Sequence, residues 1–158
     1  MSTLQFAAAA LVSYFGLLAG FFLASLTKEE LPTAVKYFPW LQKLVILAAA
    51  AMAINFFGLG IVVKIVSYSF VLLLFTLNIS TMHIYAILGV LLFAVSSSSN
   101  ALMAISSLVF IFGLFVGSDC FAKTAKKKDM TTAAKNLLVK NSAYVAVALA
   151  ARLLFNLG

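Results

Sequence analysis

The side chains able to do covalent chemistry in this sequence are one histidine, His83, one cysteine, Cys120, and the aspartate beside it, Asp119. A thiol close to an imidazole and a carboxylate can act as a nucleophile. No recognisable motif flanks these residues, so they support only a minor hypothesis, that of a lipid-modifying membrane enzyme. One histidine and one cysteine do not make a metal site. We therefore expect neither a cofactor nor a bound metal ion.

A second group of polar side chains lies within or beside long apolar stretches. Asn55 and Asn78 can form hydrogen bonds between helices, and they can also line the path of a solute or ion. Arg152 lies near the end of the chain, where its long side chain can reach the outer headgroups or bind an anion or a partner subunit. All the carboxylates lie outside the apolar stretches, which argues against ion-coupled transport; they are Glu29, Glu30, Asp119 and Asp129.

Apolar residues dominate the chain. Of its 158 residues, 65% are hydrophobic and 9% are charged, whereas a soluble domain of this length needs far more charge to cover its surface. Long apolar runs at this density are typical of membrane proteins. No stretch is long or polar enough to form a separate soluble domain, so we predict a single transmembrane domain over residues 1–158.

The apolar stretches predict an all-α fold with six transmembrane helices. The stretch 44–78 is too long for one span, because a single helix over it would reach about 50 Å against a hydrocarbon core of about 30 Å. Gly58, Gly60 and Lys64 mark a place where it can turn. The predicted spans lie at about 4–26, 42–60, 62–78, 82–97, 101–118 and 137–157.

Most of the lysines fall in two connections between spans, 27–43 and 119–136. Positive charge favours the cytoplasmic face, so we expect both connections in the cytoplasm and both termini outside, in the plasma membrane of a prokaryote. Six spans put the two connections on one side, whereas a single helix over 44–78 would separate them. Anionic lipid headgroups, and not nucleic acid, are then the expected partners of the KTAKKK run, whose lysines are Lys123, Lys126, Lys127 and Lys128.

One six-residue pattern occurs twice, as FGLLAG at 15–20 and as FGLFVG at 112–117. Two further pairs keep nearly the same offset of 97 to 99 residues: TAVK at 33–36 with TAAK at 132–135, and FFGLG at 56–60 with LFNLG at 154–158. A basic connection also joins the two spans of each pair. We interpret this as a parallel repeat of a helical hairpin, with spans one and two matching spans five and six.

Each copy of the pattern carries two glycines four residues apart, Gly16 with Gly20 and Gly113 with Gly117. Residues at this spacing share one face of a helix, and two glycines there allow a second helix backbone to approach closely. We expect these glycines to serve helix packing. Lining a permeation path is the alternative.

The stretch GLLAGFFLASLTKEEL, followed by VKYF, resembles small multispanning archaeal membrane proteins that have no assigned role. This resemblance covers one hairpin and implies an archaeal source. It implies no activity and no functional residue.

Three functions remain open from the sequence. The first is a small transporter or channel, because internal repeats recur in such proteins and place the site at the repeat interface. Spans one, two, five and six would then form the site, with Asn55 and Arg152 as its main polar contacts and Asn78 as a further candidate on the substrate or ion path. The second is a non-catalytic subunit or scaffold of a membrane complex, favoured by the small-residue helix faces; we expect a homo-oligomer or a membrane protein partner. The third is the lipid-modifying enzyme introduced above.

Overall fold

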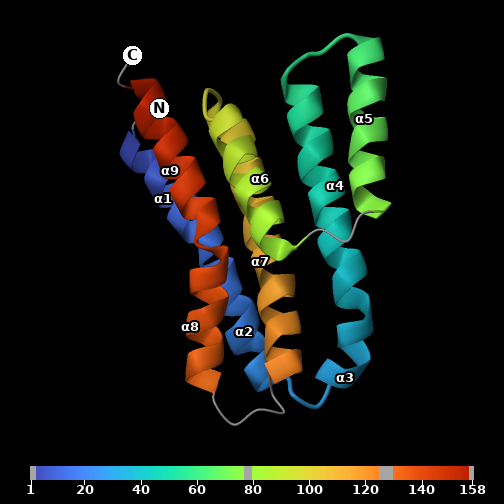
Figure 1. The fold of residues 1–158 in the computed structure, drawn as a ribbon, viewed down its shortest axis with the longest axis vertical. Helices are drawn as coiled ribbons and strands as arrows, with labels where there is room; N and C mark the ends of the chain where they lie inside the picture. Colours follow the sequence, from blue (N-terminus) through green and yellow to red (C-terminus); the bar gives the residue numbers. More distant parts are fainter. Residues whose placement is uncertain (1–2, 77–79, 125–129, 157–158) are drawn as a thin grey trace.

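The computed structural model describes residues 3–76, 80–124 and 130–156, and every regular element in these residues is helical. The helices form an elongated bundle with their axes roughly along its length (Figure 1). In chain order the elements are α1 (Thr3–Tyr14), α2 (Gly16–Leu26), α3 (Leu31–Ala34), the 3₁₀ turn η1 (Val35–Tyr37), α4 (Phe38–Phe56), α5 (Ile61–Thr76), α6 (Thr81–Ala94), α7 (Ser99–Thr124), α8 (Met130–Asn141) and α9 (Ala143–Asn156).

Among the described residues, four helical stretches are long and apolar enough to cross a membrane. They are Thr3–Leu26, Leu31–Phe56, Ser99–Thr124 and Thr131–Leu154, and Thr81–Ala94 is a shorter apolar helix. Three of the four are divided: α1 passes into α2 at Phe15, α8 passes into α9 at Ser142, and the 3₁₀ turn η1 separates α3 from α4. The apolar surface agrees with a membrane location, because large side chains such as those of Leu4, Ile61 and Leu154 are more than two-thirds exposed.

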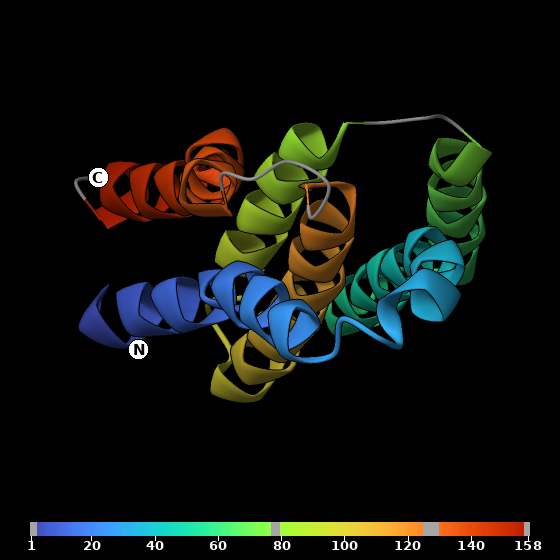
Figure 2. The same ribbon diagram turned by 90° about the horizontal axis from the view of Figure 1, so that it is seen from below.

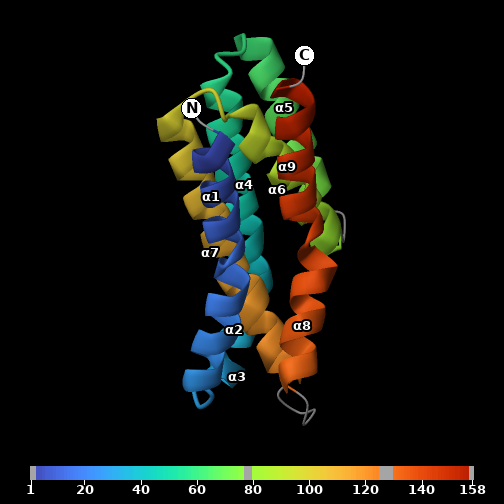
Figure 3. The same ribbon diagram turned by 90° about the vertical axis from the view of Figure 1, so that its left-hand side faces the viewer.

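The two ends of the bundle differ. The start of α1 and the end of α9 lie at one end, which we call the upper end; the end of α2, the end of α7 and the start of α8 lie at the lower end (Figure 1). Helices α5 and α6 occupy only the upper part, and α6 begins at about mid-height (Figure 3). At 1.5 Å per residue, the 14 residues of α6 cover about 21 Å, against about 39 Å for the 26 residues of α7.

Helix α7 is the centre of the fold. It contacts α1, α2, α4, α6 and α8, and the view along the bundle shows it between α2, α4 and α6 (Figure 2). Its buried residues follow the 3.6-residue helical period over most of its length, as expected for a helix enclosed on several sides. They are Leu102, Ile105, Val109, Phe112, Gly113, Val116, Gly117 and Phe121.

The helix boundaries differ from the predicted spans at the lower end. We expected a connection over 27–43, but helix begins at Leu31, where Pro32 occupies the first turn, a position that proline tolerates. Phe38 is buried and its ring lies 6.3 Å from that of Phe115 on α7. Packing on α7 therefore continues the helix through residues that appeared to be a loop.

The same effect extends α7 beyond residue 118, where we placed the end of the fifth span. Ser118 Oγ donates a hydrogen bond to the Gly20 carbonyl at 3.0 Å, and the rings of Phe21 and Phe121 meet edge to face at 5.2 Å. The predicted connection 119–136 is accordingly helical to Thr124 and again from Met130. Within 44–78 the chain turns between Phe56 and Ile61, with Gly58 at a φ of +59°.

Candidate functional site

The two copies of the repeated six-residue pattern face each other where α2 crosses α7. A Cβ added at Gly16 would lie 2.2 Å from the Phe110 carbonyl oxygen, and one added at Gly117 would lie 2.2 Å from the Leu17 carbonyl oxygen. At Gly20 the distance to the Leu114 carbonyl oxygen would be 2.1 Å. These backbones can therefore approach only where side chains are missing.

The α2–α7 contact is close to symmetric. Gly20 faces Leu114, and Gly117 faces Leu17. These two contacts are equivalent, because Gly20 and Gly117 occupy the same position of the repeated pattern, and Leu17 and Leu114 occupy another. Gly113 lies against Gly16, its own equivalent. Since α2 and α7 both run from the upper to the lower end (Figure 1), the two copies pack as a parallel pair.

Above this crossing, a buried polar cluster joins two of the divided helices, α1–α2 and α8–α9. We define it by Ser13, Tyr14, Tyr85, Asn141 and Tyr144. Ser13 Oγ and Tyr144 OH share a hydrogen bond of 2.7 Å, and Tyr14 OH donates to the backbone carbonyl of α8 at residue 138. The rings of Tyr14 and Tyr144 stack with centroids 6.2 Å apart, and the Tyr85 ring lies 6.0 Å from that of Tyr144. The breaks at Phe15 and Ser142 thus meet in one polar layer.

Two polar atoms of the cluster are buried without a hydrogen-bond partner among the described residues, Tyr85 OH and Asn141 Oδ1. The Tyr85 and Asn141 side chains are 0% and 1% exposed. Leaving such a group unsatisfied costs about 1–3 kcal/mol. Atoms of this kind indicate a place that water or a ligand completes.

A cavity of about 670 Å³ lies beneath the start of α6, between that helix, α7 and α8. Most of the described residues around it are polar, and one of them, Asn141, also belongs to the polar cluster above. The lining residues are Ser80, Thr81, Val116, Asp119, Cys120, Lys123, Thr124, Thr132, Ala133, Asn136, Leu137, Lys140 and Asn141. This cavity has a size within the range usual for small-molecule sites.

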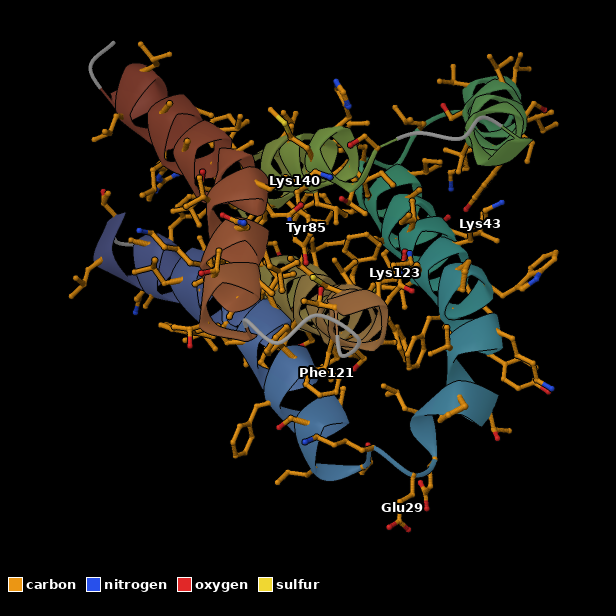
Figure 4. All side chains as sticks on the ribbon, turned by 60° about the horizontal axis from the view of Figure 1, so that its bottom comes forward. Glu29, Lys43, Tyr85, Phe121, Lys123 and Lys140 are labelled. Atoms are coloured by element: carbon orange, nitrogen blue, oxygen red, sulfur yellow. The ribbon has the colours of Figure 1, made fainter. Side chains whose placement is uncertain are left out.

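The described lining of the cavity is positively charged. Asp119 on α7 forms an ion pair with Lys123 one turn further on, and Lys140 on α8 adds a second cation, so that the net charge is +1. In the view toward the lower end, Tyr85 is seen between Lys123 and Lys140 (Figure 4). The amino end of α6 adds the positive end of a helix dipole.

Arg152 lies near the upper end of the bundle, where its side chain connects helices. Its Nη1 donates to Ser96 Oγ at 3.4 Å, and its guanidinium carbon lies 5.7 Å from the centre of the Phe6 ring. The side chain thus turns toward the protein and joins α9 to α1 and to the turn after α6, instead of extending away from it toward headgroups. Ser96 is itself buried.

Asn55 connects α4 to α5. Its Nδ2 donates to Tyr68 OH at 3.0 Å, and its Oδ1 accepts from Lys64 Nζ at 3.3 Å. It also lines a second, mainly apolar hollow of about 430 Å³ between α4 and the start of α7. Asn55 therefore forms hydrogen bonds between helices, which is one of its two predicted roles; the other was to line the path of a solute or ion.

Other predicted residues are only partly brought together. Asp119 and Cys120 both line the lower cavity, whereas His83 is exposed and is not among its lining residues. Asn78, Lys126, Lys127 and Lys128 lie outside the described residues. Within the described part of the chain, no group of three or more His, Cys, Asp or Glu side chains could hold a metal ion.

The tyrosines of the polar cluster were not predicted as functional residues, although the positions of two of them carry a signal in the sequence. Tyrosine in membrane proteins is enriched at the two interfaces. Tyr14 and Tyr144 instead fall well inside predicted spans, where a hydroxyl needs a partner within the protein, whereas Tyr85 lies near the start of the predicted span 82–97 and carries no such signal.

Comparison with known proteins adds no family to this description. No protein-family model, curated protein or solved structure matches the chain. Functional interpretation therefore depends on the geometry alone.

Proposed function

We propose that this protein is a small transporter or channel that admits its solute through the cavity beneath α6. The observation that carries the proposal is the position of this cavity, which opens among polar side chains of the lower end and reaches the buried Asn141. Substrate sites in transporters lie near the middle of the membrane and are built from interrupted helices. Here the breaks of α1–α2 and α8–α9 meet in the polar layer directly above the cavity.

The same proposal places six helices in the membrane, with the lower end in the cytoplasm and both termini outside. It is supported by the distribution of charge. Lysines concentrate at the lower end, where the described ones are Lys28, Lys36, Lys43, Lys123 and Lys135; Lys140 lies higher, two residues before the break at Ser142. The lengths of α5 and α6, about 24 and 21 Å, fit a bilayer that thins locally around them.

The parallel repeat also supports a transport role. Its two copies meet at equivalent glycines in α2 and α7. The second helix of each hairpin also packs on the first helix of the other hairpin. In one direction α4 contacts α7, and in the other α8 contacts α2 and α9 contacts α1. Such an arrangement has an approximate twofold axis along the membrane normal, which is the geometry of parallel-repeat transporters. The polar layer lies at this interface, where Ser13 and Tyr14 of α1 bond to α8 and α9, and the cavity lies beside it between α6 and the second hairpin.

Solute flux through proteoliposomes tests this proposal. The protein is reconstituted, and re-swelling after osmotic shrinkage is followed by light scattering for a panel of small ionic and neutral solutes. We expect faster re-swelling than in empty liposomes for at least one solute, and slower re-swelling when Asn136→Trp fills the cavity. Val139→Trp, on an exposed position of the same helix outside the cavity, is the matched control. Rates equal to those of empty liposomes for the whole panel would contradict a transport role.

A scaffold role is the second candidate, and the position of α5 favours it. This helix packs on α4 at the edge of the bundle (Figure 2), and Ile61, Val62 and Ile65 are each at least 60% exposed. Lipid covers such a surface as well as a partner helix does. Native mass spectrometry in nanodiscs separates the two cases, because a scaffold should retain a partner protein there.

A further inference from the structure

We propose that the hollow between the end of α4 and the start of α7 binds one anionic phospholipid, with an acyl chain in the hollow and the headgroup phosphate at Lys64. This hollow lies at the opposite end of α7 from the cavity beneath α6, so lipid binding there does not depend on transport. We call it the upper hollow and define it by its lining residues, which are Ala51, Met52, Asn55, Phe56, Val95, Asn100, Ala101, Ala104 and Ile105.

Small side chains create the upper hollow. Ala51 on α4 and Ala101 and Ala104 on α7 leave a volume of about 430 Å³ between two helices that pack against each other. Seven of the nine lining residues are apolar, and apolar walls offer water no hydrogen-bond partners. The occupant is therefore apolar, and the candidates in a membrane are a lipid chain and a helix of another protein.

The size of the upper hollow favours an acyl chain over a helix. The lining runs from residue 51 to 56 on α4 and from residue 100 to 105 on α7, which is about 8 Å along each helix. A helix with its side chains is at least about 10 Å across, so about 8 Å of its length fills about 600 Å³. The hollow is smaller than this, whereas an acyl chain has no side groups and can enter it.

The polar residues of the lining lie on its upper side. Asn55 is near the end of α4 and Asn100 is near the start of α7, and both of these helix ends are at the upper end of the bundle (Figure 1). Both asparagines are exposed. The apolar residues Ala51 and Ile105 lie deeper along the same two helices. A phospholipid has the same order, because its headgroup lies at the membrane surface and its chains extend toward the middle.

Lys64 supplies a positive charge at this polar rim. Its Nζ donates to Asn55 Oδ1 at 3.3 Å, and its side chain is half-buried although Val63 and Ile65 beside it are exposed. Lys64 is the fourth residue of α5, about 5 Å below the upper end of that helix, which is a depth that headgroups reach.

An anion is needed beside this lysine. The sequence has no aspartate or glutamate between residues 31 and 118, and Asp119, in the lower part of α7, is paired with Lys123. A lysine within a membrane-spanning helix pairs with an anion or reaches the headgroups. The phosphate of a lipid whose chain fills the upper hollow meets this need with a charge-assisted hydrogen bond.

Quenching of a single tryptophan by brominated lipid measures this binding. Trp40 is the chain's one tryptophan; it is replaced by phenylalanine, and Phe56→Trp then puts the reporter in the wall of the hollow, with Met52→Trp as a second reporter there. The protein is reconstituted in mixtures of phosphatidylcholine and phosphatidylglycerol, with bromine on the acyl chains of one or the other. Leu4→Trp is the control reporter, since Leu4 is exposed at the upper end and outside the hollow.

We expect the reporters in the hollow to show about a fivefold preference for phosphatidylglycerol, the effect of one lysine beside an anionic headgroup. The reporter at Leu4 should show almost none. Lys64→Gln should remove the preference, because glutamine keeps an N–H donor for Asn55 but not the charge, and Lys64→Arg should retain it.

Filling the hollow tests the position of the acyl chain. Ala104→Phe should reduce quenching by both brominated lipids, whereas Met103→Phe, at an exposed position outside the hollow, should not. Equal affinity for the two lipids at both reporters in the hollow, or an unchanged preference in Lys64→Gln, would overturn the inference. Quenching by neither lipid would also overturn it and would assign the hollow to protein, such as a second copy of this chain.

Discussion

The substitution Gly20→Ala tests the packing on which the polar layer and the cavity depend. The added Cβ would lie 2.1 Å from the Leu114 carbonyl oxygen, and ordinary contact begins at 3.4 Å, so α2 and α7 must separate by about 1.3 Å. The carbonyl oxygen belongs to the backbone and the Cβ is bonded directly to the backbone, so no side-chain rotation can relieve the contact. The hydrogen bond from Ser118 Oγ to the Gly20 carbonyl, now 3.0 Å, would stretch past its ~3.5 Å limit.

These two losses set the size of the effect. Overpacking costs about 1–3 kcal/mol, and an interhelical hydrogen bond in a membrane contributes about 0.6 kcal/mol. We therefore expect Gly20→Ala to lower the free energy of unfolding by about 1.6–3.6 kcal/mol, the sum of the two losses. Circular dichroism measures this loss in mixed micelles with a rising fraction of denaturing detergent.

Gly60→Ala is the matched control, since a Cβ at Gly60 meets no atom within 4 Å. It should leave the midpoint of the unfolding transition almost unchanged. Equal midpoints for the two variants would refute the reasoning, because the same methyl group would then be tolerated between two backbones as well as in open space.

Three further predictions follow from individual contacts. Tyr85→Phe removes a buried hydroxyl with no described partner and should raise the free energy of unfolding by about 1 kcal/mol or more, whereas Tyr144→Phe, which breaks a 2.7 Å hydrogen bond, should lower it by about 1 kcal/mol in the same detergent titration; equal losses in the two variants would contradict the assignment. Asn55→Leu removes the hydrogen bonds that join α5 to α4 and should broaden the distance distribution between spin labels on the two helices; an unchanged distribution would show that these bonds do not hold α5. In a cysteine-free background, Thr81→Cys and Gly60→Cys, which flank α5, should react with impermeant reagents from opposite sides of sealed vesicles, and reaction of both from one side would contradict a crossing by α5.

The sequence was sufficient to predict a helical membrane protein and the turn near Gly58, because apolar run length and glycine placement are local signals. It also predicted that four glycines lie on helix-packing faces: Gly16, Gly20, Gly113 and Gly117. It could not show that the two glycine pairs face each other, since partner choice between helices depends on the whole bundle.

The lower end was harder to predict for a physical reason. Leu31, Phe38 and Phe121 stand among charged residues, which appeared to mark loops, but their burial against neighbouring helices continues the helices. Contacts between helices, and not local composition, thus determine where the helices end in this part of the chain. The cavity could not be inferred at all, because it arises from the shortness of α6 beside α7 and not from a motif.

Accessibility of Cys120 tests the central claim most directly, since transport through the lower end requires an aqueous path from the cytoplasm to the cavity. Sealed vesicles of known orientation are treated with a charged methanethiosulfonate reagent that does not cross lipid, and modification is counted by mass spectrometry. Our account predicts that the thiol reacts when the lower face is exposed to the reagent and that Asn136→Trp slows the reaction while Val139→Trp does not. Modification only from the face that carries the two termini, or from neither face, would contradict it.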